Sequence, residues 1–196
     1  GGGRQSMVEA QEYPEDYDGI WASCPAINWS KFLPVGLWAN AVMNSNNYIV
    51  PPSKVKFAMN EAQNTVGGKE KYYEYDKPLE FDYYTLVGKK VKNDIFTEID
   101  AKVLTEIYGG PARNGKRLWY FGRPGVLCYN VGIPIGAFWY TPIFHKPKPF
   151  FLSTYYCRWV TKNPKQKFDK VTKDEFYKIY DASVNEFADC LADNPN

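Results

Sequence analysis

The spacing of apolar residues predicts two long amphipathic helices in the second half of the chain. In residues 96–108, Ile99, Val103 and Ile107 recur every four residues, so they share one face of a helix. Residues 172–192 show the same kind of periodicity. Their apolar positions are Phe176, Ile179, Tyr180, Val184 and Phe187. Both apolar faces are expected to pack against a hydrophobic core.

Capping residues support both predictions. Thr97 can cap the first helix through its hydroxyl group, and the Gly-Gly-Pro sequence of residues 109–111 ends it. Thr172 and Glu175 have the spacing of a capping box at the start of the second helix. Further predicted elements are helices over residues 35–45 and 52–63, and loops with short strands over residues 111–136.

The N-terminal part of the chain predicts a helix followed by a buried strand. Residues 2–13 are rich in good helix formers. Pro14 ends the helix, because the residue before a proline avoids helical geometry. After turn-forming residues 16–19, the almost uncharged run of residues 20–24 ends at Pro25. A short apolar run bounded by turn residues is typical of a buried parallel strand.

This predicted strand has no obvious sheet neighbours in the sequence. A buried parallel strand needs strands on both sides and helices on both faces of its sheet. Nothing downstream resembles four or five further strands that alternate with helices. We therefore expect the sheet to which residues 20–24 belong to lie outside this chain.

Composition excludes several classes of protein. Hydrophobic residues make up 44% and charged residues 23% of the 196 residues, as in ordinary globular domains. The formal net charge of +2 is too small to indicate a nucleic-acid partner. No apolar run reaches the roughly 18 residues of a membrane span, and no signal peptide is recognisable. The aromatic content of 17% suits a core and a pocket for a flat ligand.

Side chains suited to catalysis or metal binding are scarce. The sequence contains no Gly-x-Ser-x-Gly, and its single histidine, His145, is followed by Lys-Pro, a context that favours a structural or surface role. We therefore assign no catalytic side chain within this chain. The cysteines are far apart and lack the Cys-x-x-Cys spacing of a zinc site. They are Cys24, Cys128, Cys157 and Cys190.

The first 29 residues resemble the tannase and feruloyl esterase family, a branch of the α/β-hydrolases. Residues 1–5, Gly-Gly-Gly-Arg-Gln, match the family's Gly-Cys-Ser-x-Gly-Gly-Arg-Gln elbow from the position directly after the serine. Glu-Ala-Gln at residues 9–11 and Pro-Glu-Asp-Tyr-Asp-Gly-Ile at residues 14–20 follow in the family's order. Pro-Ala-Ile-Asn-Trp at residues 25–29 completes the match.

The resemblance continues more weakly along the rest of the chain. Phe-Asp-Tyr-Tyr-Thr-Leu at residues 81–86 resembles the family's Phe-Asp-Pro-x-x-Leu. Residues 107–111 and 115–120 resemble its Gly-Pro and Gly-x-x-Leu-Trp-Tyr stretches. The end of the chain, from Trp159 onward, resembles the segment before the family's chain returns to its catalytic core.

The resemblance implies an α/β-hydrolase fragment, with one core helix and one parallel strand, plus a mixed α/β lid domain. The implied boundaries are residues 1–40 for the partial core, 41–185 for the lid and 186–196 for the return to the core. By the same resemblance, the catalytic serine would directly precede Gly1, whose backbone N–H would serve the oxyanion hole. The aspartate and the His-Cys pair would follow residue 196.

The implied activity is serine carboxylic ester hydrolysis of feruloyl, galloyl or terephthalate-like esters by a secreted enzyme. The chain alone is expected to be inactive and to need the missing core segments. Core packing and a substrate pocket are competing uses of five aromatic residues. These candidates for an aromatic pocket are Trp119, Tyr120, Phe121, Trp139 and Tyr140.

Two features of the family are expected to be absent. Many relatives carry an Asp-rich calcium site, but residues 64–75 contain no aspartate, and Lys69 and Lys71 would repel a cation. We therefore predict no calcium and no other cofactor. Neither partner of the family's disulfide beside the serine and histidine lies in this chain, and Cys24 is expected to be buried and reduced. Cys157 could pair with Cys190.

Two alternatives to an ester hydrolase remain at the level of sequence. The chain could be a binding module that keeps an aromatic pocket without catalytic ends, or a truncated domain with no independent function. A serine upstream and a His-Cys pair downstream in the complete gene would eliminate the binding module.

Overall fold

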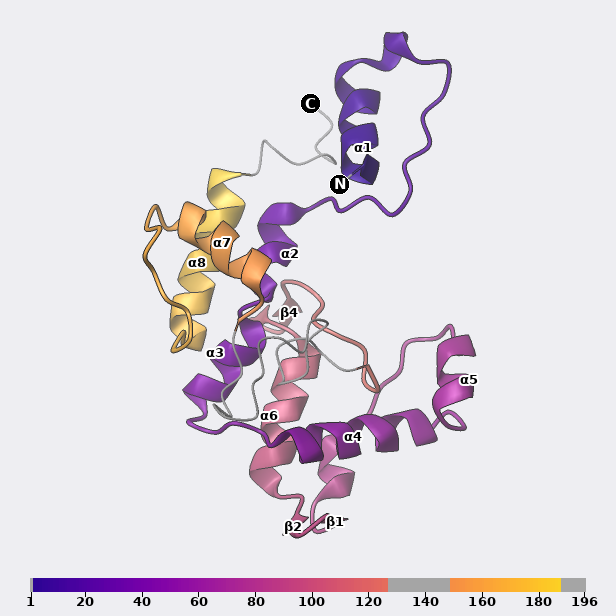
Figure 1. The fold of residues 1–196 in the computed structure, drawn as a ribbon, viewed down its shortest axis with the longest axis vertical. Helices are drawn as coiled ribbons and strands as arrows, with labels where there is room; N and C mark the ends of the chain where they lie inside the picture. The colour runs from indigo at the N-terminus through magenta and orange to yellow at the C-terminus, as the bar shows by residue number, and fades with distance from the viewer. Residues whose placement is uncertain (1, 127–148, 188–196) are drawn as a thin grey trace.

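The computed structural model describes residues 2–126 and 149–187, and most of this part is helical (Figure 1). Its α-helices are α1 (Gly2–Glu12), α2 (Trp29–Val35), α3 (Trp38–Ser45), α4 (Pro52–Asn64), α5 (Lys69–Glu74), α6 (Glu98–Gly109), α7 (Phe151–Val160) and α8 (Lys173–Glu186). The 3-10 helices are η1 (Pro14–Asp16) and η2 (Tyr83–Leu86).

The sheets of the described residues are two short antiparallel hairpins. In the first, β1 (Lys90–Val91) pairs with β2 (Asp94–Ile95), with Lys90 opposite Ile95. In the second, β3 (Ala112–Arg113) pairs with β4 (Lys116–Arg117). The second hairpin falls within residues 111–136, where short strands were expected from the sequence.

The predicted helices at residues 2–13, 52–63, 96–108 and 172–192 are confirmed as α1, α4, α6 and α8, although α8 ends at Glu186. Both predicted caps form. The N–H of Thr97 donates to Asp100 at 2.8 Å, and the N–H of Thr172 donates to Glu175 at 2.8 Å. Each reciprocal pair satisfies donors that the first turn of a helix leaves free.

The helix predicted over residues 35–45 is confirmed as α3, although it begins only at Trp38, and a separate helix that was not predicted, α2, ends at Val35. The N–H of Leu37 donates to the carbonyl of Pro34 at 2.9 Å, which tightens the chain between the two helices. Gly36 occupies this bend, and a Cβ there would lie only 2.8 Å from Cβ of Ser153 in α7. The chain therefore bends at Gly36, where the absence of a side chain lets α2 and α7 approach closely.

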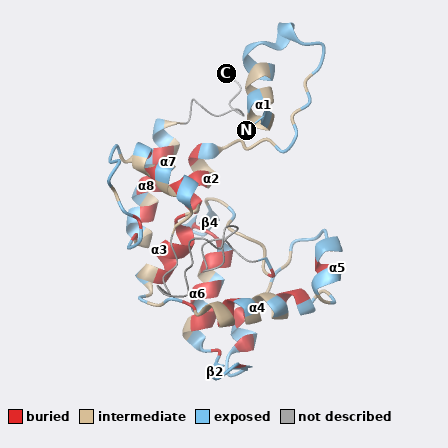
Figure 2. Cartoon of the chain, viewed as in Figure 1, coloured by how far each residue is buried: buried red, intermediate tan, exposed pale blue. Residues whose placement is uncertain are grey.

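The hydrophobic core lies between α2, α3, α6, α7 and α8, and it extends to α4 and η2 (Figure 2). Trp38 is at its centre. Its indole N–H donates to the carbonyl of Glu106 at 3.1 Å, and its ring centroid lies 5.1 Å from that of Phe176. The apolar faces predicted for α6 and α8 are confirmed, because Val103, Ile107 and Phe176 are fully buried.

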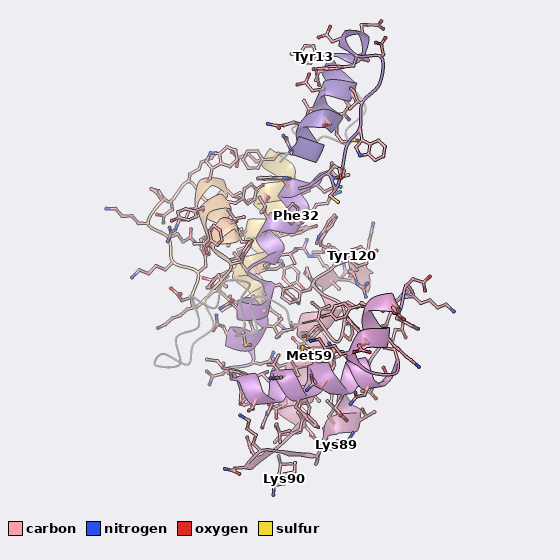
Figure 3. The ribbon with its side chains drawn as sticks, turned by 45° about the vertical axis from the view of Figure 1, so that its right-hand side comes forward. Tyr13, Phe32, Met59, Lys89, Lys90 and Tyr120 are labelled. Atoms are coloured by element: carbon pink, nitrogen blue, oxygen red, sulfur yellow. The ribbon has the colours of Figure 1, made fainter. Side chains whose placement is uncertain are left out.

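Residues 2–28 form an N-terminal arm that projects from the rest of the described chain (Figure 1). None of the residues of α1 is buried. Figure 3 places Tyr13 at the distal end of this arm, far from Met59 and Lys89. The arm therefore exposes surface that the rest of the described chain does not cover.

The prediction of a buried strand at residues 20–24 is wrong for the chain as it stands. This segment has no regular secondary structure and pairs with no strand of the described residues. Trp21 is 90% exposed, and Cys24, which we expected to be buried, is also exposed. The physical reason is that an apolar run becomes a buried strand only where a sheet is available to receive it.

Candidate functional site

The N-terminal arm holds α1 tightly against the segment that follows η1. A Cβ on Gly3 would collide with the carbonyl oxygen of Ser23 and would lie 2.8 Å from Cα of Pro25. A Cβ on Gly2 would meet nothing within 4 Å. Only Gly3 of these two is therefore required by a close backbone approach. Gly1, the predicted oxyanion-hole residue, lies outside the described residues.

A side-chain contact closes the loop between α1 and residues 17–28. The hydroxyl of Tyr17 donates to the carboxylate of Glu9 at 3.3 Å. The negative charge of Glu9 raises the pKa of Tyr17, with smaller contributions from burial and the hydrogen bond. Tyr17 therefore stays a neutral donor toward Glu9 at ordinary pH. The contact is exposed, and it joins α1 to the segment that follows η1.

The aromatic candidates Trp119, Tyr120 and Phe121 follow the β3–β4 hairpin. Trp119 and Phe121 are half-buried against the hydrophobic core, whereas Tyr120 is 71% exposed. The guanidinium of Arg117 lies 5.3 Å from the Tyr120 ring centroid. Figure 3 shows Tyr120 at the surface between Phe32 and the end of α4 that precedes α5. Trp119 and Phe121 therefore pack as core residues, and Tyr120 presents its ring to solvent.

Backbone contacts fix this aromatic segment in place. Gly110 has a positive φ of 76°, and a Cβ there would lie 2.7 Å from the carbonyl oxygen of Trp119. The carbonyl of Leu118 accepts a hydrogen bond from Tyr180 at 3.1 Å. The other two candidates, Trp139 and Tyr140, lie outside the described residues. A pocket formed by all five candidates therefore stays a prediction.

Arg123 is a positioning residue that the sequence pattern did not single out. Its guanidinium lies 4.6 Å from the ring centroid of Tyr72 and 5.2 Å from that of Tyr75. It also donates to the carbonyl of Lys77 at 3.2 Å. Tyr72 in turn donates to the carbonyl of Pro124 at 2.9 Å. These contacts attach residues 123 and 124 to α5 and to the segment that follows it.

Comparison with known proteins agrees with this arrangement of motifs. Residues 1–71 match the family described as tannase and feruloyl esterase. A probable feruloyl esterase of Arthroderma benhamiae is 35% identical over 91% of the chain. The chain belongs to the tannase and feruloyl esterase family. A second member, probable feruloyl esterase B of Aspergillus clavatus, is 28% identical over 99% of the chain.

The chain spans about a third of these relatives, 36% of the Arthroderma protein and 35% of the Aspergillus protein. The fold is also similar to part of the tannin acyl hydrolase from Aspergillus niger, with a TM-score of 0.65 and 20% sequence identity. That similarity covers 95% of this chain and 37% of the other. It shows a shared fold for nearly the whole segment.

Residues 64–75, in which we predicted no calcium site, form the end of α4, a glycine turn and α5. No group of three or more His, Cys, Asp or Glu side chains gathers anywhere in residues 2–126 and 149–187. In the turn, Gly67 and Gly68 have positive φ angles of 94° and 96°, which glycine adopts without strain. The absence of calcium stays a prediction, and the donor set here does not resemble a calcium shell.

The cysteines within the described residues are free thiols. Cys157 is buried in α7, and burial raises its pKa to about 12. A thiol in such surroundings is a poor nucleophile, because the reactive thiolate is suppressed. Because Cys157 is a free thiol, the pairing with Cys190 that the sequence allowed is not found. His145, Cys128 and Cys190 lie outside the described residues, so the predicted role of His145 stays a prediction.

None of the helices in the described residues combines the length and the apolar character needed to cross a membrane.

Proposed function

We propose that this chain is the lid-bearing middle portion of a serine carboxylic ester hydrolase that acts on esters of aromatic acids. The match of residues 1–71 to the tannase and feruloyl esterase family carries this proposal. The tight packing of Gly3 against Ser23 and Pro25 supports it. A strained turn from strand to helix exposes the nucleophile in such enzymes, and it requires small residues where helix and strand meet.

The proposed chemistry is acyl transfer by a serine, a histidine and an aspartate in the flanking polypeptide. The serine would directly precede Gly1 and attack the ester carbonyl, while the histidine accepts its proton. The backbone N–H of Gly1 would stabilise the oxyanion at the start of α1. The positive end of the α1 dipole would favour the same negative charge. This chain then contributes a backbone donor and no catalytic side chain.

The proposed domain boundaries are those that the family resemblance implies. Residues 1–40 would belong largely to the catalytic core, where residues 20–24 would add a strand to its sheet. Residues 41–185 would form the lid, and residues 186–196 would return the chain to the core. The exposed Trp21 supports this division, because large apolar side chains left in solvent mark a missing contact surface.

The lid would close over the aromatic acid and exclude water from the acyl-enzyme. Tyr120 is the described aromatic candidate with the greatest exposure, so we propose that it contacts the acid. Trp139 and Tyr140 remain candidate contacts, whereas Trp119 and Phe121 would support the pocket from behind. By family resemblance the enzyme would be secreted. It would need no cofactor, because residues 64–75 lack the aspartates of the family's calcium site, and its composition gives no reason to expect a nucleic-acid or membrane partner.

The decisive experiment uses the complete protein and methyl ferulate as substrate. The complete protein should hydrolyse methyl ferulate and react with a fluorophosphonate at the residue before Gly1. Replacing that residue by alanine should abolish both properties. Gly1→Val should lower the turnover by about 10²- to 10³-fold, as expected for the loss of one oxyanion donor.

The isolated chain of residues 1–196 serves as the negative control, and it should neither hydrolyse the ester nor be labelled. Hydrolysis by the isolated chain would place the nucleophile within residues 1–196 and refute the proposal. An inert complete protein that still binds ferulate would favour the non-catalytic binding module instead.

A further inference from the structure

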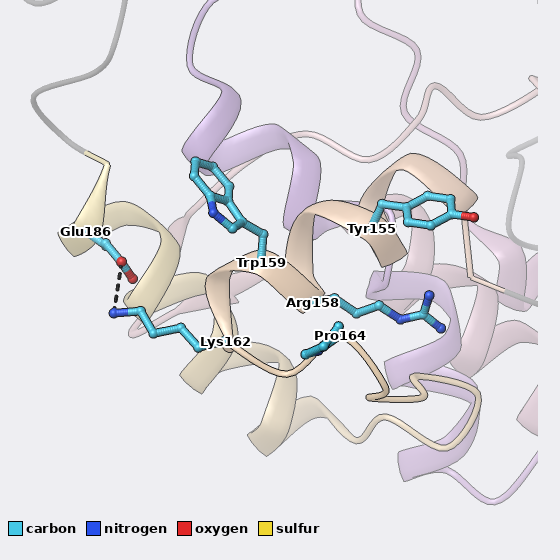
Figure 4. A pocket seen from close by; sticks show the side chains of 6 residues that line it. All are labelled: Tyr155, Arg158, Trp159, Lys162, Pro164 and Glu186. Carbon is cyan, nitrogen blue, oxygen red and sulfur yellow. Dashed lines mark ion pairs between the residues drawn. The ribbon is translucent and has the colours of Figure 1, made fainter.

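A pocket of about 560 Å³ lies on the outer side of α7, on the opposite side of that helix from the buried Cys157. Three of its lining residues belong to α7, two to the loop after α7 and one to the last turn of α8 (Figure 4). The lining residues are Tyr155, Arg158, Trp159, Lys162, Pro164 and Glu186.

Two aromatic rings one helical turn apart provide its apolar surface. Tyr155 is 65% exposed and Trp159 is 62% exposed. Trp159 stacks on Phe187, with 4.5 Å between ring centroids and 23° between ring planes. One face of the indole is therefore supported by the protein while much of the side chain stays in solvent. Such a supported, exposed ring is a platform on which a ligand can stack.

Charged groups lie at both ends of this pocket. At one end, the Nε of Arg158 donates to the carbonyl of Gln166 at 2.8 Å, and its guanidinium lies 5.7 Å from the Tyr155 ring centroid. At the other end, Lys162 pairs with Glu186 at 3.1 Å. Figure 4 shows the Lys162–Glu186 pair beside Trp159, and Arg158 beside Tyr155. Each ring is thus accompanied by hydrogen-bonding groups.

The exposure of the two aromatic rings limits which kind of ligand this pocket can bind. A small-molecule pocket normally buries about 70–90% of its ligand, but rings that are more than half exposed cannot enclose one. The pocket instead suits a segment of an extended molecule that lies along α7. A protein partner fits less well, because Lys and Glu are depleted at the centres of protein interfaces, whereas Lys162 and Glu186 line this pocket.

A sugar chain has the required chemistry. One face of a pyranose ring carries C–H groups, which stack on the electron-rich face of an aromatic ring. The hydroxyl groups at its edge both donate and accept hydrogen bonds, as guanidinium, ammonium and carboxylate groups require. We propose that the outer face of α7 is an accessory polysaccharide-binding site, with Trp159 and Tyr155 as stacking platforms and Arg158, Lys162 and Glu186 as hydroxyl partners.

The test measures the fraction of the complete protein that sediments with insoluble arabinoxylan. Tyr155→Ala and Trp159→Ala should each reduce the partition coefficient by about fivefold, in line with the loss of one aromatic contact. Tyr73→Ala is the matched control, because Tyr73 is a 71% exposed ring on α5 outside this pocket. It should leave the binding unchanged. Soluble xylohexaose should compete with the polymer for the wild-type protein.

Hydrolysis of methyl ferulate keeps this proposal separate from the proposed enzymatic activity, because that ester carries no sugar. Tyr155→Ala should leave its hydrolysis within about twofold of the wild type, which also reports that the variant folds. Trp159→Phe retains a ring on Phe187 and should lose less binding than Trp159→Ala. Wild-type protein that does not sediment, or Tyr155→Ala and Tyr73→Ala proteins that bind alike, would overturn the accessory site. If another part of the complete protein covers the outer face of α7, the wild-type protein will not sediment with the polymer.

Discussion

The ammonium group of Lys54 lies 2.8 Å from the carboxylate of Asp100, although the side chains are only 3% and 0% exposed. The hydroxyl of Tyr48 donates to the other oxygen of Asp100 at 2.7 Å, and Asp94 lies 3.0 Å from the same ammonium group. Burial lowers the pKa of Lys54, but its hydrogen bonds with Asp100 and Asp94 outweigh this effect and raise it overall. The cluster joins α4 to the first turn of α6.

Removing the ammonium group of Lys54 should show how much this cluster contributes to the free energy of unfolding. Lys54→Met leaves the Asp100 carboxylate buried without its cation, so the free energy of unfolding should fall by about 3–5 kcal/mol. Urea unfolding of the complete protein measures the loss. The matched control is Lys89→Met, because Lys89 pairs with Glu61 at 3.0 Å while 48% exposed. That change should cost less than about 1 kcal/mol, and equal losses would contradict the assignment.

Alkaline pH should destabilise the protein through the buried thiol of Cys157 and the half-buried phenol of Tyr48. Burial raises the pKa of Cys157 from 9.0 to about 12. Burial, and then the hydrogen bond to Asp100, raises the pKa of Tyr48 from 10.0 to about 12. The unfolded chain loses each proton first, so stability is complete below pH 9 and falls as the pH rises toward 12. The limiting slope is about 1.4 kcal/mol per pH unit for each group.

A single substitution separates the two contributions. Between about pH 9 and 10 the thiol of the unfolded chain titrates before the phenol, as the reference pKa values require. Cys157→Ala should therefore flatten the dependence of stability on pH in that interval and leave it steep above it. Urea unfolding at several pH values provides the measurement. An unchanged slope between pH 9 and 10 would show that Cys157 does not control it.

Local signals predicted the helices well and the site poorly. The apolar spacing of α6 and α8, and the capping residues Thr97 and Thr172, depend only on neighbours in sequence. The bend at Gly36 depends on Ser153, more than a hundred residues away, so the local pattern could not reveal it. Arg123 was missed for the same reason, because the two rings that it contacts, those of Tyr72 and Tyr75, lie about fifty residues earlier in the sequence.

The failed prediction at residues 20–24 has a different cause. The apolar pattern predicts a segment that avoids water, but it does not say which surface would receive it. In the described residues that surface is absent, so Trp21 is left in solvent. The aromatic candidates show the converse problem. Composition cannot distinguish half-buried Trp119 and Phe121 from exposed Tyr120, because all three are large aromatic residues that are adjacent in the sequence.

Adding one methyl group at Gly3 should disturb the proposed elbow. Gly3→Ala places a Cβ against the backbone of Ser23 and Pro25, and overpacking of this kind costs about 1–3 kcal/mol. The displaced α1 should also lower the turnover of methyl ferulate by the complete protein. Gly2→Ala is the control, because its Cβ would meet nothing within 4 Å. Equal activity of the two variants would remove Gly3 from the catalytic framework.

The α4–α5 region should be held by packing rather than by calcium. Tyr72 is 2% exposed, and Arg123 covers its ring. Tyr72→Ala removes this contact and should destabilise the complete protein by about 3–5 kcal/mol, the usual cost of deleting a large buried aromatic side chain. Tyr73→Ala should have little effect, because Tyr73 is mostly exposed.

Thermal melting of the complete protein tests directly whether calcium stabilises it. Thermal melting should occur at the same temperature in excess calcium and in excess chelator, because Lys69 and Lys71 replace the carboxylates that calcium requires. A fall of several degrees in chelator alone would refute this prediction. Tyr72→Ala should behave identically in the two buffers.

Hydrogen exchange at residues 20–24 tests whether the exposed segment belongs to a sheet in the complete protein. In the isolated chain of residues 1–196 these amides have no strand partner, so they should exchange nearly as fast as in an unfolded peptide. In the complete protein, strand pairing should slow them by at least about a hundredfold, since buried strands open only through larger unfolding events. The exposed turn at Gly67 and Gly68 provides an internal control that should exchange at the same rate in both. Fast exchange of residues 20–24 in both proteins would mean that no sheet receives Trp21, and the assignment of residues 1–40 to a catalytic core would fail.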